Sequence, residues 1–413
     1  MSSGKIILSK KDKTVGGTIH LTGSKSESNR ALIMQALSGD KIKVENLSQA
    51  ADTVTLNAIL EAWSDHPSGL VDVGPAGTAM RFLAAFATLQ KGEVTLTGTE
   101  RMKQRPIGIL AEALRTLGAN IEYVEKEGYP PLRITGPFVQ KTNSITIKGD
   151  VSSQYISALL LIAPCLPQGL ELNIEGELTS RPYVEMTLAM LEQAGIRYQF
   201  DEPVISIAHQ EFVPAVIAVE PDWSAASYWY AIVALCEQGE LFLPGLNGYS
   251  LQGDSRITEI MANFGITSQF RDGGVHLKKE PKEVLRKIFD FKECPDLAQT
   301  VIVVCAALGH NATFTGLETL KIKETDRVKA LQTELAKIGV NLIEKNLTYK
   351  LDCSGRHFPS RLSIQTYEDH RMAMAFAPLA LVIPEIEIDD EKVVEKSYPH
   401  FWEDLKKAGF EIT

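Results

Sequence analysis

Apolar positions gather in six similar segments along the chain. Each segment begins with small or polar residues and runs into an apolar stretch rich in small side chains, which predicts a helix. The copies are "GSKSESNRALIMQALSG", "GPAGTAMRFLAAFATLQKG", "GDVSSQYISALLLIAPCL", "EPDWSAASYWYAIVALCEQG", "CPDLAQTVIVVCAALG" and "EDHRMAMAFAPLALVIP". With Gly77, Ser152, Ser224, Asp296 and His370 as markers, successive copies are 72 to 75 residues apart. Such regular spacing predicts a repeated structural unit.

A second series of helices, amphipathic in pattern, lies between these segments. They are "ADTVTLNAILEAW", "RPIGILAEALRTLG", "RPYVEMTLAMLEQAG", "DSRITEIMANFG", "TDRVKALQTELAKIG" and "FWEDLKKAG". All but the first end on a glycine, a natural left-handed cap, followed by a strand-like run such as "ANIEYV" or "VNLIEK". The unit is therefore helix, strands, helix, strand, repeated about six times.

Six units in 413 residues divide most simply into two domains of three. The spacing is too long for a solenoid repeat. We therefore expect an α/β fold with two similar compact domains and an active cleft between them. A boundary near "VEPDW" (219–223) would halve the repeats.

Composition and charge limit the classes of function that the chain could have. With 44% apolar and 23% charged residues the chain is typical of a soluble globular protein, and its net charge of −10 argues against a nucleic-acid or membrane-surface binder. The start, "MSSGKIILSKKDK", lacks the apolar core of a signal peptide, and no apolar run reaches the roughly 18 residues of a membrane helix. Five cysteines without a CxxC pair indicate reduced thiols and a cytoplasmic location.

The stretch "TGSKSESNR" (22–30) combines hydroxyl groups with two cations just before an apolar run. A P-loop is excluded because Ser24 and Ile19 stand where that motif needs glycine. A serine N-cap is the simpler reading, with an anion site as the alternative. Capping does not explain Lys25 and Arg30, because cations are unfavourable at the positive end of a helix.

Other helix starts carry similar groups. They are Gly77, Thr78 and Arg81; Ser152, Ser153 and Gln154; Asp296; and His370 with Arg371. The segments "RMKQRPIG" and "LKIKETDRVK" add further cations, for which a solvated helix face is the simpler interpretation. Asp296 and Glu324 are the best candidates for an acid/base pair, because a carboxylate among cations stays ionised and can accept a proton. The alternative for Asp296 is a helix N-cap.

These motifs resemble a known family. "GSKSESNR", "AGTAMR", "RMKQRPI", "DVSSQY", "SRPY", "KIKETDR" and "YEDHRMAM" are similar to those of the 5-enolpyruvylshikimate-3-phosphate (EPSP) synthases, in the same order. The resemblance implies transfer of the enolpyruvyl group of phosphoenolpyruvate to the 5-hydroxyl of shikimate 3-phosphate, through a tetrahedral intermediate that loses phosphate. It implies two domains, 23–220 and 1–22 with 221–413, each of three βαβαββ-type units around a pseudo-threefold axis, an inside-out α/β barrel. It also implies that the N-terminal strand returns to the second domain.

The resemblance further implies a set of site residues. Shikimate 3-phosphate would be held by Lys25, Ser26, Arg30, Ser152, Ser153, Gln154, Ser180, Asp296 and Lys323. Phosphoenolpyruvate would be held by Lys25, Gly77, Arg105, Gln154, Arg327, Arg371 and Lys396. Asp296 would take the hydroxyl proton and Glu324 would protonate the methylene carbon, with Lys25 as a third catalytic residue. The partners implied are small molecules only, with no metal, cofactor, nucleic acid or membrane, for a monomer in the cytoplasm.

The sequence departs from the family pattern in places, and two alternative functions were also considered. Pro75, Phe82 and Thr319 replace residues more usual in the family. The sister enzyme that acts on UDP-N-acetylglucosamine carries a reactive cysteine before the "RP" helix, and "GTERMKQRP" has none. A non-catalytic binder of phosphometabolites or RNA ends on the same fold is the third possibility, disfavoured by the negative net charge and by the presence of both Asp296 and Glu324.

Overall fold

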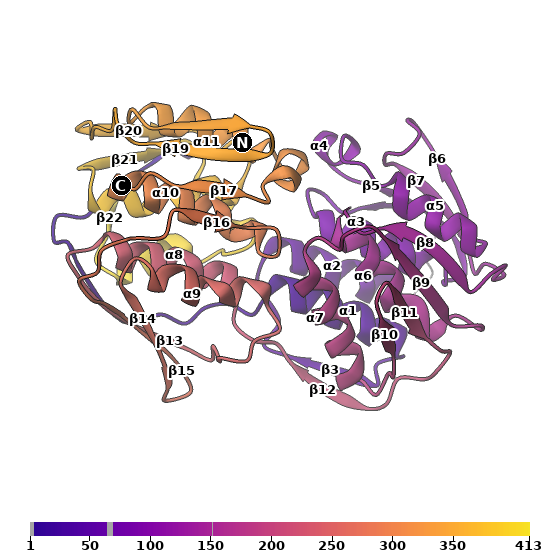
Figure 1. Cartoon of the computed structure of the whole chain (residues 1–413). Coiled ribbons are helices and arrows are strands. Elements are labelled where there is room, and N and C mark those ends of the chain that lie inside the picture. Colours follow the sequence, from indigo (N-terminus) through magenta and orange to yellow (C-terminus); the bar gives the residue numbers. More distant parts are fainter. Residues whose placement is uncertain (1–3, 64–68, 151) are drawn as a thin grey trace. The chain divides into compact units, whose positions relative to one another are not determined.

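The computed structural model describes residues 4–63, 69–150 and 152–413, so Val151 of the "DVSSQY" motif lies outside the described residues. The chain divides into two compact units (Figure 1): Gly23–Val219, and Glu220–Thr413 together with the chain up to Thr22. Glu220, expected in the first domain, belongs to the second unit. Its carboxylate accepts hydrogen bonds from Trp223 Nε1 at 2.9 Å and from Asn247 Nδ2 at 3.0 Å, both downstream in the chain.

Three buried helices form the centre of the unit Gly23–Val219. They are α1 (Lys25–Leu37), α3 (Gly77–Ala87) and α6 (Ser153–Ile162), and each contacts the other two. Strands surround them in three sheets of the described residues. In order, these are β4 (Gly69–Asp72), β5 (Gly92–Thr97), β7 (Leu132–Gly136), β6 (Asn120–Tyr123); β10 (Gln199–Asp201), β11 (Val204–Ile207), β9 (Leu170–Glu175), β8 (Ser144–Lys148); and β12 (Ala215–Ala218), β3 (Ile42–Glu45).

The second unit repeats this plan. Its central helices, α8 (Trp223–Leu235), α10 (Ala298–Leu308) and α12 (His370–Phe376), also contact one another. Its sheets are β14 (Ile266–Arg271), β15 (Gly274–Lys279), β13 (Gln238–Pro244), β2 (Thr14–Thr18); β16 (Ile288–Asp290), β17 (Thr313–Thr315), β19 (Thr348–Asp352), β18 (Asn341–Lys345); and β20 (Arg361–Ile364), β21 (Glu385–Ile388), β1 (Ile6–Ser9), β22 (Glu411–Ile412).

In the part of the chain that the structure describes, the five four-stranded sheets share one pairing order: a parallel pair followed by two antiparallel pairs. In the last sheet β1 takes the third place, antiparallel to both β21 and β22. The other N-terminal strand, β2, pairs in parallel with β13. Both N-terminal strands therefore pair with strands of the second unit.

A second set of helices connects the strands. It comprises α2 (Ala51–Trp63), α5 (Gly108–Leu117), α7 (Arg181–Gln193), α9 (Ile257–Ala262), α11 (Arg327–Ala336) and α13 (Phe401–Lys407). The closing glycines have positive φ, from +69° at Gly339 to +120° at Gly118, as expected for left-handed caps. Both series of helices predicted from the repeat are therefore confirmed.

Remaining short helical elements lie in the segments between the longer helices and strands. They are α4 (Glu100–Lys103), η1 (Ala163–Cys165), η2 (Gly253–Arg256), η3 (Pro295–Leu297), η4 (Glu318–Ile322), η5 (Ala377–Leu381) and η6 (Glu391–Lys396). Three of them carry predicted site residues or their neighbours: Asp296 lies in η3, Lys323 directly follows η4, and Lys396 ends η6. Irregular segments next to helix starts therefore supply part of the candidate site.

Candidate active site

Arg327 is the centre of an ion-pair cluster in the second unit. Its guanidinium contacts three carboxylates: Nη1 lies 3.1 Å from Asp296 Oδ1, Nη2 lies 2.8 Å from Glu324 Oε2, and Nε lies 2.6 Å from Asp369 Oδ2. The side chain is only 2% exposed. Burial alone opposes its charge, but Asp369, Glu324 and Asp296 outweigh that effect and raise the pKa of Arg327. The sequence-predicted acid and base therefore share one cation.

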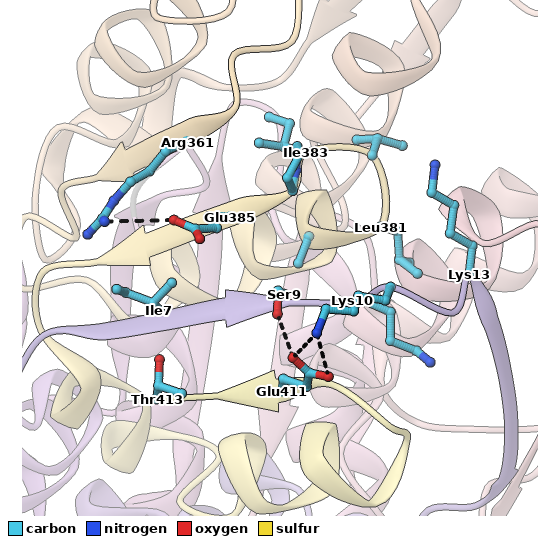
Figure 2. A pocket seen from close by; sticks show the side chains of 14 residues that line it. Ile7, Ser9, Lys10, Lys13, Arg361, Leu381, Ile383, Glu385, Glu411 and Thr413 are labelled. Carbon is cyan, nitrogen blue, oxygen red and sulfur yellow. Dashed lines mark hydrogen bonds and ion pairs between the residues drawn. The ribbon is translucent and has the colours of Figure 1, made fainter.

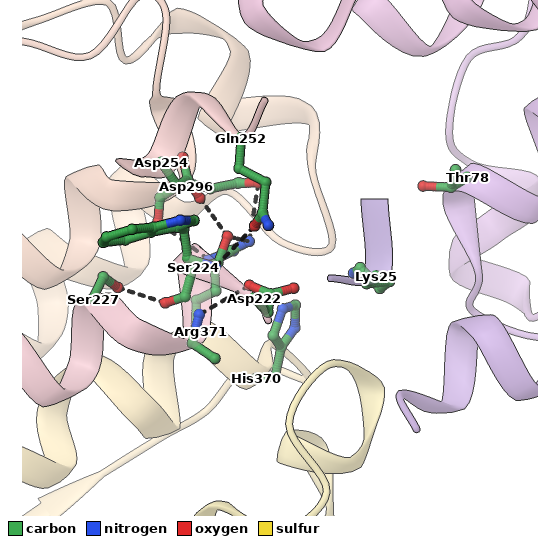
Figure 3. Close-up of polar contacts among 12 residues, drawn as sticks. Lys25, Thr78, Asp222, Ser224, Ser227, Gln252, Asp254, Asp296, His370 and Arg371 are labelled. Carbon is green, nitrogen blue, oxygen red and sulfur yellow. Dashed lines mark hydrogen bonds and ion pairs between the residues drawn. The ribbon is translucent and has the colours of Figure 1, made fainter. Parts of the chain in front are cut away.

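Arg371 joins the same cluster through Asp296 (Figure 3). Its Nη2 lies 2.9 Å from Asp296 Oδ2, so both oxygens of Asp296 face a guanidinium. The same Nη2 donates to Ser224 Oγ at 3.3 Å, and Nη1 donates to the Tyr228 hydroxyl at 3.3 Å. Burial raises the pKa of Tyr228 to about 12, so this hydroxyl stays protonated at neutral pH.

Both arginines lie at the start of a helix that an aspartate caps. Asp326 caps α11 by accepting from Lys329 N at 3.0 Å, and Asp369 caps α12 by accepting from Arg371 N at 2.9 Å. Arg327 and Arg371 are thus in the first turns of their helices, where the N-terminal dipole is unfavourable to a cation. The neighbouring carboxylates offset that cost.

The N-cap interpretation of Asp296 is wrong. Helix α10 begins at Ala298, its N-cap is Leu297, and no side chain caps it. Asp296 lies in the preceding η3, and its carboxylate binds Arg327 and Arg371 instead. Electrostatic attraction from two buried guanidinium groups outweighs a single hydrogen bond to a backbone N–H.

Glu324 binds two cations from different elements. Besides Arg327, its Oε1 contacts Lys396 Nζ at 3.2 Å, and both side chains are nearly buried. Lys323 precedes Glu324 and is half-buried. The structure therefore brings Asp296, Glu324, Arg327, Arg371 and Lys396 into one cluster, with Lys323 adjacent in the chain.

The first unit holds the remaining predicted residues. Ser24 caps α1, since its Oγ accepts from Glu27 N at 3.4 Å, so the capping part of the "TGSKSESNR" interpretation is confirmed. Lys25 follows, with its Nζ 3.4 Å from Asp52 Oδ2 of α2, and the neighbouring Ser26 is half-buried.

Arg30 is buried and ties α1 to two neighbouring helices. It donates to Thr187 Oγ1 at 2.7 Å and to Ser157 Oγ at 2.9 Å, and its guanidinium lies 5.5 Å from the centre of the Phe82 ring. Burial lowers the pKa of Arg30 to about 10, which still leaves it charged at neutral pH. Phe82, a departure from the family pattern, thus packs against a predicted site residue.

Gly77 and Arg105 are direct neighbours. A Cβ built on Gly77 would lie 2.6 Å from Arg105 Nη1, so only a residue without a side chain leaves the guanidinium where it is. Arg81, one turn along α3, donates to the Pro106 carbonyl at 2.9 Å and fixes the segment that carries Arg105. Nearby in the fold, Gln154 Nε2 donates to Thr78 Oγ1 at 3.1 Å.

Three predicted serines stand at helix starts without capping them. Ser152 and Ser180 are the N-cap residues of α6 and α7, yet neither side chain caps its helix. Ser180 also has φ +53° and ψ +38°, a left-handed conformation that is uncommon for a residue other than glycine. Ser153 is buried in the first turn of α6. The side chains of Ser152 and Ser180 thus make no capping hydrogen bond with their helices.

Several residues that contact predicted site residues were not predicted, among them Asp52, Asp369 and Tyr228. Asp369 stands one residue before the predicted His370-Arg371 pair, and its position as the "D" of "EDHRMAM" was a signal for a helix cap. Asp52, at the start of α2, pairs with Lys25 from a separate helix, which no local sequence pattern predicts.

A pocket of about 600 Å³ lies elsewhere, on the sheet that contains β1 (Figure 2). Its lining residues include Lys11, Arg361, Leu381 and Ile383, but none of the predicted site residues. Lys11 pairs with Glu411 at 3.3 Å and Arg361 pairs with Glu385 at 3.7 Å. The pocket is therefore separate from the candidate site.

Solved structures share this fold. An EPSP synthase from Acinetobacter baumannii matches with a TM-score of 0.77 and 21% identity, covering 99% of each chain. The enolpyruvyl transferase NikO from Streptomyces tendae matches with a TM-score of 0.74 and 14% identity, covering 100% of this chain and 99% of that one. At these identities the likeness defines the fold, a mixed α/β architecture found in enolpyruvyl transferases.

Sequence similarity is more specific. The family model for EPSP synthase (3-phosphoshikimate 1-carboxyvinyltransferase) matches residues 9–66 and 61–405. A 3-phosphoshikimate 1-carboxyvinyltransferase from Bacteroides fragilis is 49% identical over 403 residues, 96% of each chain, and one from Sodalis glossinidius is 36% identical over 94% of each. The chain belongs to the EPSP synthase family, which favours this reading over the sister enzyme for UDP-N-acetylglucosamine. Among the described residues no helix has the length and apolar character needed to span a membrane.

Proposed function

We propose that the chain transfers the enolpyruvyl group of phosphoenolpyruvate to the 5-hydroxyl of shikimate 3-phosphate and releases phosphate. Family membership supports this reaction at the level of the whole chain. The observation that carries the chemistry is the Arg327 cluster, where two candidate proton-transfer groups share one buried cation. Each unit is inferred to be an inside-out α/β barrel of three repeats, with the site residues divided between the two units.

The proposed roles follow the chemistry of each side chain. Lys25, Ser26, Arg30, Ser152, Ser153, Gln154, Ser180 and Lys323 hold shikimate 3-phosphate, and Lys25, Gly77, Arg105, Gln154, Arg327, Arg371 and Lys396 hold phosphoenolpyruvate. Guanidinium and ammonium groups suit carboxylate and phosphate ligands. The rigid helix starts keep these donors in place while charge develops on the reacting groups.

Asp296 accepts the proton of the 5-hydroxyl while the oxygen of that hydroxyl bonds to C2 of phosphoenolpyruvate. Glu324 gives a proton to C3, which becomes a methyl group. The tetrahedral intermediate then loses phosphate from C2 and a proton from the methyl group. The methyl proton returns to Glu324, and the proton held by Asp296 leaves with the phosphate. Atoms and charges balance without any further reactant.

Glu324 needs a proton before it can act as an acid. In the structure Arg327 and Lys396 both contact its carboxylate and stabilise its ionised form. An incoming anion that binds Arg327 and Lys396 competes with the Glu324 carboxylate for these two cations. We infer that substrate binding thereby favours protonation of Glu324.

Phosphate release tests the proposal. The protein is mixed with phosphoenolpyruvate and either shikimate 3-phosphate or UDP-N-acetylglucosamine, and free phosphate is measured over time. We expect phosphate release when the acceptor is shikimate 3-phosphate and none when it is UDP-N-acetylglucosamine. Release only with the nucleotide sugar would support the sister activity, and binding of either compound without release would support a non-catalytic binder.

A monomeric state, a cytoplasmic location and small-molecule partners belong to the same proposal. All five cysteines are free thiols, and four of them are buried, which fits a reducing compartment. Sedimentation at micromolar concentration measures the oligomeric state, and a dimer would contradict the proposed monomer.

A further inference from the structure

A buried carboxyl group lies behind the candidate site. Asp254 in η2 is 2% exposed, and its Oδ2 accepts a short hydrogen bond from Ser224 Oγ. Ser224 Oγ in turn accepts from Arg371 Nη2 at 3.3 Å. Figure 3 shows these three side chains around Asp296. The proposed function gives no role to Asp254 or to Ser224.

The direction of these hydrogen bonds is fixed by chemistry. A guanidinium can only donate, so Ser224 must accept from Arg371 with a lone pair. A serine hydroxyl has a single proton, which Ser224 donates to Asp254 Oδ2. Asp254 thus keeps the lone pairs of Ser224 directed at Arg371.

The segment that carries Asp254 is held firmly against α8. Gln252 Oε1 accepts from Trp223 N at 2.8 Å, and Gln252 Nε2 donates to the Pro221 carbonyl at 2.9 Å. Asp254 follows two residues later, and Ser224 is the second residue of α8. The Gln252 side chain therefore holds in place the two segments that carry Asp254 and Ser224.

We propose that Asp254 is a positioning residue for the anion-binding Arg371, acting through the hydroxyl of Ser224. It also places a second acid group beside the cation that is inferred to hold phosphoenolpyruvate. This inference rests on the proposed function, because it concerns the same substrate and the same arginine.

The surroundings of Asp254 make its charge depend on pH near neutrality. The charged and titratable groups that face it are Asp222 before α8, Asp296 in η3, Arg371 in α12 and the Cys294 thiol. Burial, with a further contribution from Asp296, raises the pKa of Asp254 to about 7. Its Oδ1 is buried and has no hydrogen-bond partner among the described residues, so it is the oxygen that can carry the proton.

The two protonation states affect an anion at Arg371 differently. When Asp254 is neutral, only the other partners of Arg371 balance its positive charge. When Asp254 is ionised, it adds a negative charge next to the bound anion. Affinity for phosphoenolpyruvate should therefore fall as pH rises through about 7. Shikimate 3-phosphate, which is not assigned to Arg371, should be affected much less.

The experiment compares four variants of the full chain with the wild type. Ser224→Ala and Asp254→Ala break the link to Arg371, Asp254→Asn keeps an acceptor for Ser224 but cannot ionise, and Glu259→Gln on the exposed side of α9 is the control. For each, the Michaelis constants of both substrates and kcat are measured at several pH values, with the melting temperature as a check of folding.

We expect Ser224→Ala and Asp254→Ala to raise the Michaelis constant of phosphoenolpyruvate about tenfold, the loss expected for a hydrogen bond to a charged group. The constant for shikimate 3-phosphate should change less than about twofold on the same reasoning. Asp254→Asn should match the wild type at pH 6 but not share its loss of affinity by pH 8. Because phosphoenolpyruvate itself titrates, the ratio of wild type to Asp254→Asn is the informative quantity.

Several outcomes would overturn the inference. Equal rises in both Michaelis constants, or a fall in kcat alone, would assign Asp254 a general structural role. Parallel pH profiles for the wild type and Asp254→Asn would exclude a charge effect at Arg371. An active wild type with unaltered variants rejects this inference only, whereas a wild type that releases no phosphate rejects the proposed function itself.

Discussion

Asp296 has both carboxylate oxygens against guanidinium groups, and this arrangement governs what its removal would do. We expect Asp296→Ala to lower turnover by about a hundredfold or more, because the proposed base is lost. Phosphoenolpyruvate should still bind, since Arg327 and Arg371 lose a competing carboxylate. Phosphate release and calorimetric titration measure the two effects. Asp290→Ala in β16 is the control, and near-normal turnover of Asp296→Ala would exclude Asp296 as the base.

Asp254 also predicts a pH dependence of stability. Burial raises its pKa from 3.8 to about 7 on folding, so the native state holds this proton more tightly than the unfolded chain. Its contribution is full below about pH 4 and is lost as pH rises to about 7. Asp254→Asn cannot ionise and should gain stability relative to wild type, by up to about 4 kcal/mol, between pH 4 and pH 8. Denaturant unfolding at both pH values measures this, and parallel changes in the two proteins would contradict it.

Gly77 tests the position of Arg105. A methyl group there would meet Arg105 Nη1 at 2.6 Å, and this contact is the far end of a flexible side chain. Gly77→Ala should therefore move the guanidinium without unfolding α3. We expect weaker binding of phosphoenolpyruvate and a nearly unchanged melting temperature. The family resemblance also implies that glyphosate is an inhibitor at this site, and we expect Gly77→Ala to reduce that inhibition. Gly248→Ala, where the added Cβ has ordinary contacts at 3.5 Å, is the control. Unchanged ligand affinities in Gly77→Ala would exclude Arg105 from the site.

At the scale of elements, glycines with positive φ differ in what surrounds them. Gly339 follows α11 at φ +69°, and a Cβ there would lie 2.1 Å from the Gly355 carbonyl oxygen. Gly273 has a similar φ of +73° but open space around it. Both alanine variants pay about 1 kcal/mol for the left-handed backbone, and Gly339→Ala should lose about 1–3 kcal/mol more through crowding. Urea unfolding measures the difference, and equal losses would show that backbone conformation alone matters.

The helices could be predicted from sequence because each repeat carries its own apolar run and all but the first carry a closing glycine. The place of β1 came only from the family resemblance, since Ile6–Ser9 contains no signal for pairing with β22 some 400 residues later. For the site, the cluster of Asp296, Glu324 and Arg327 joins three residues chosen from local motifs. Asp369 and Asp52 were missed because side-chain contacts between separate helices leave no periodic pattern.

At the scale of the whole molecule, the proposed substrate residues are divided between the two units. A ligand that binds residues of both units links them, so the first substrate reduces the cost of binding the second. We expect shikimate 3-phosphate to tighten the binding of glyphosate or phosphoenolpyruvate by roughly 1–3 kcal/mol. Calorimetry with glyphosate, in the presence and absence of shikimate 3-phosphate, measures this coupling. Identical affinities would mean that the two ligands bind independently.

The position of β1 has a consequence for biosynthesis. Ser9 in β1 and Glu411 in β22 are hydrogen-bonded neighbours separated by 402 residues. At translation rates of about 5–20 residues per second, β1 leaves the ribosome roughly 20–80 s before its partner. The unit Gly23–Val219 draws all its paired strands from within its own stretch of chain, so it can fold during that interval. β2 can pair once β13 has been made, but β1 must remain unpaired until β21 and β22 arrive, and a nascent chain released early would expose this edge to aggregation.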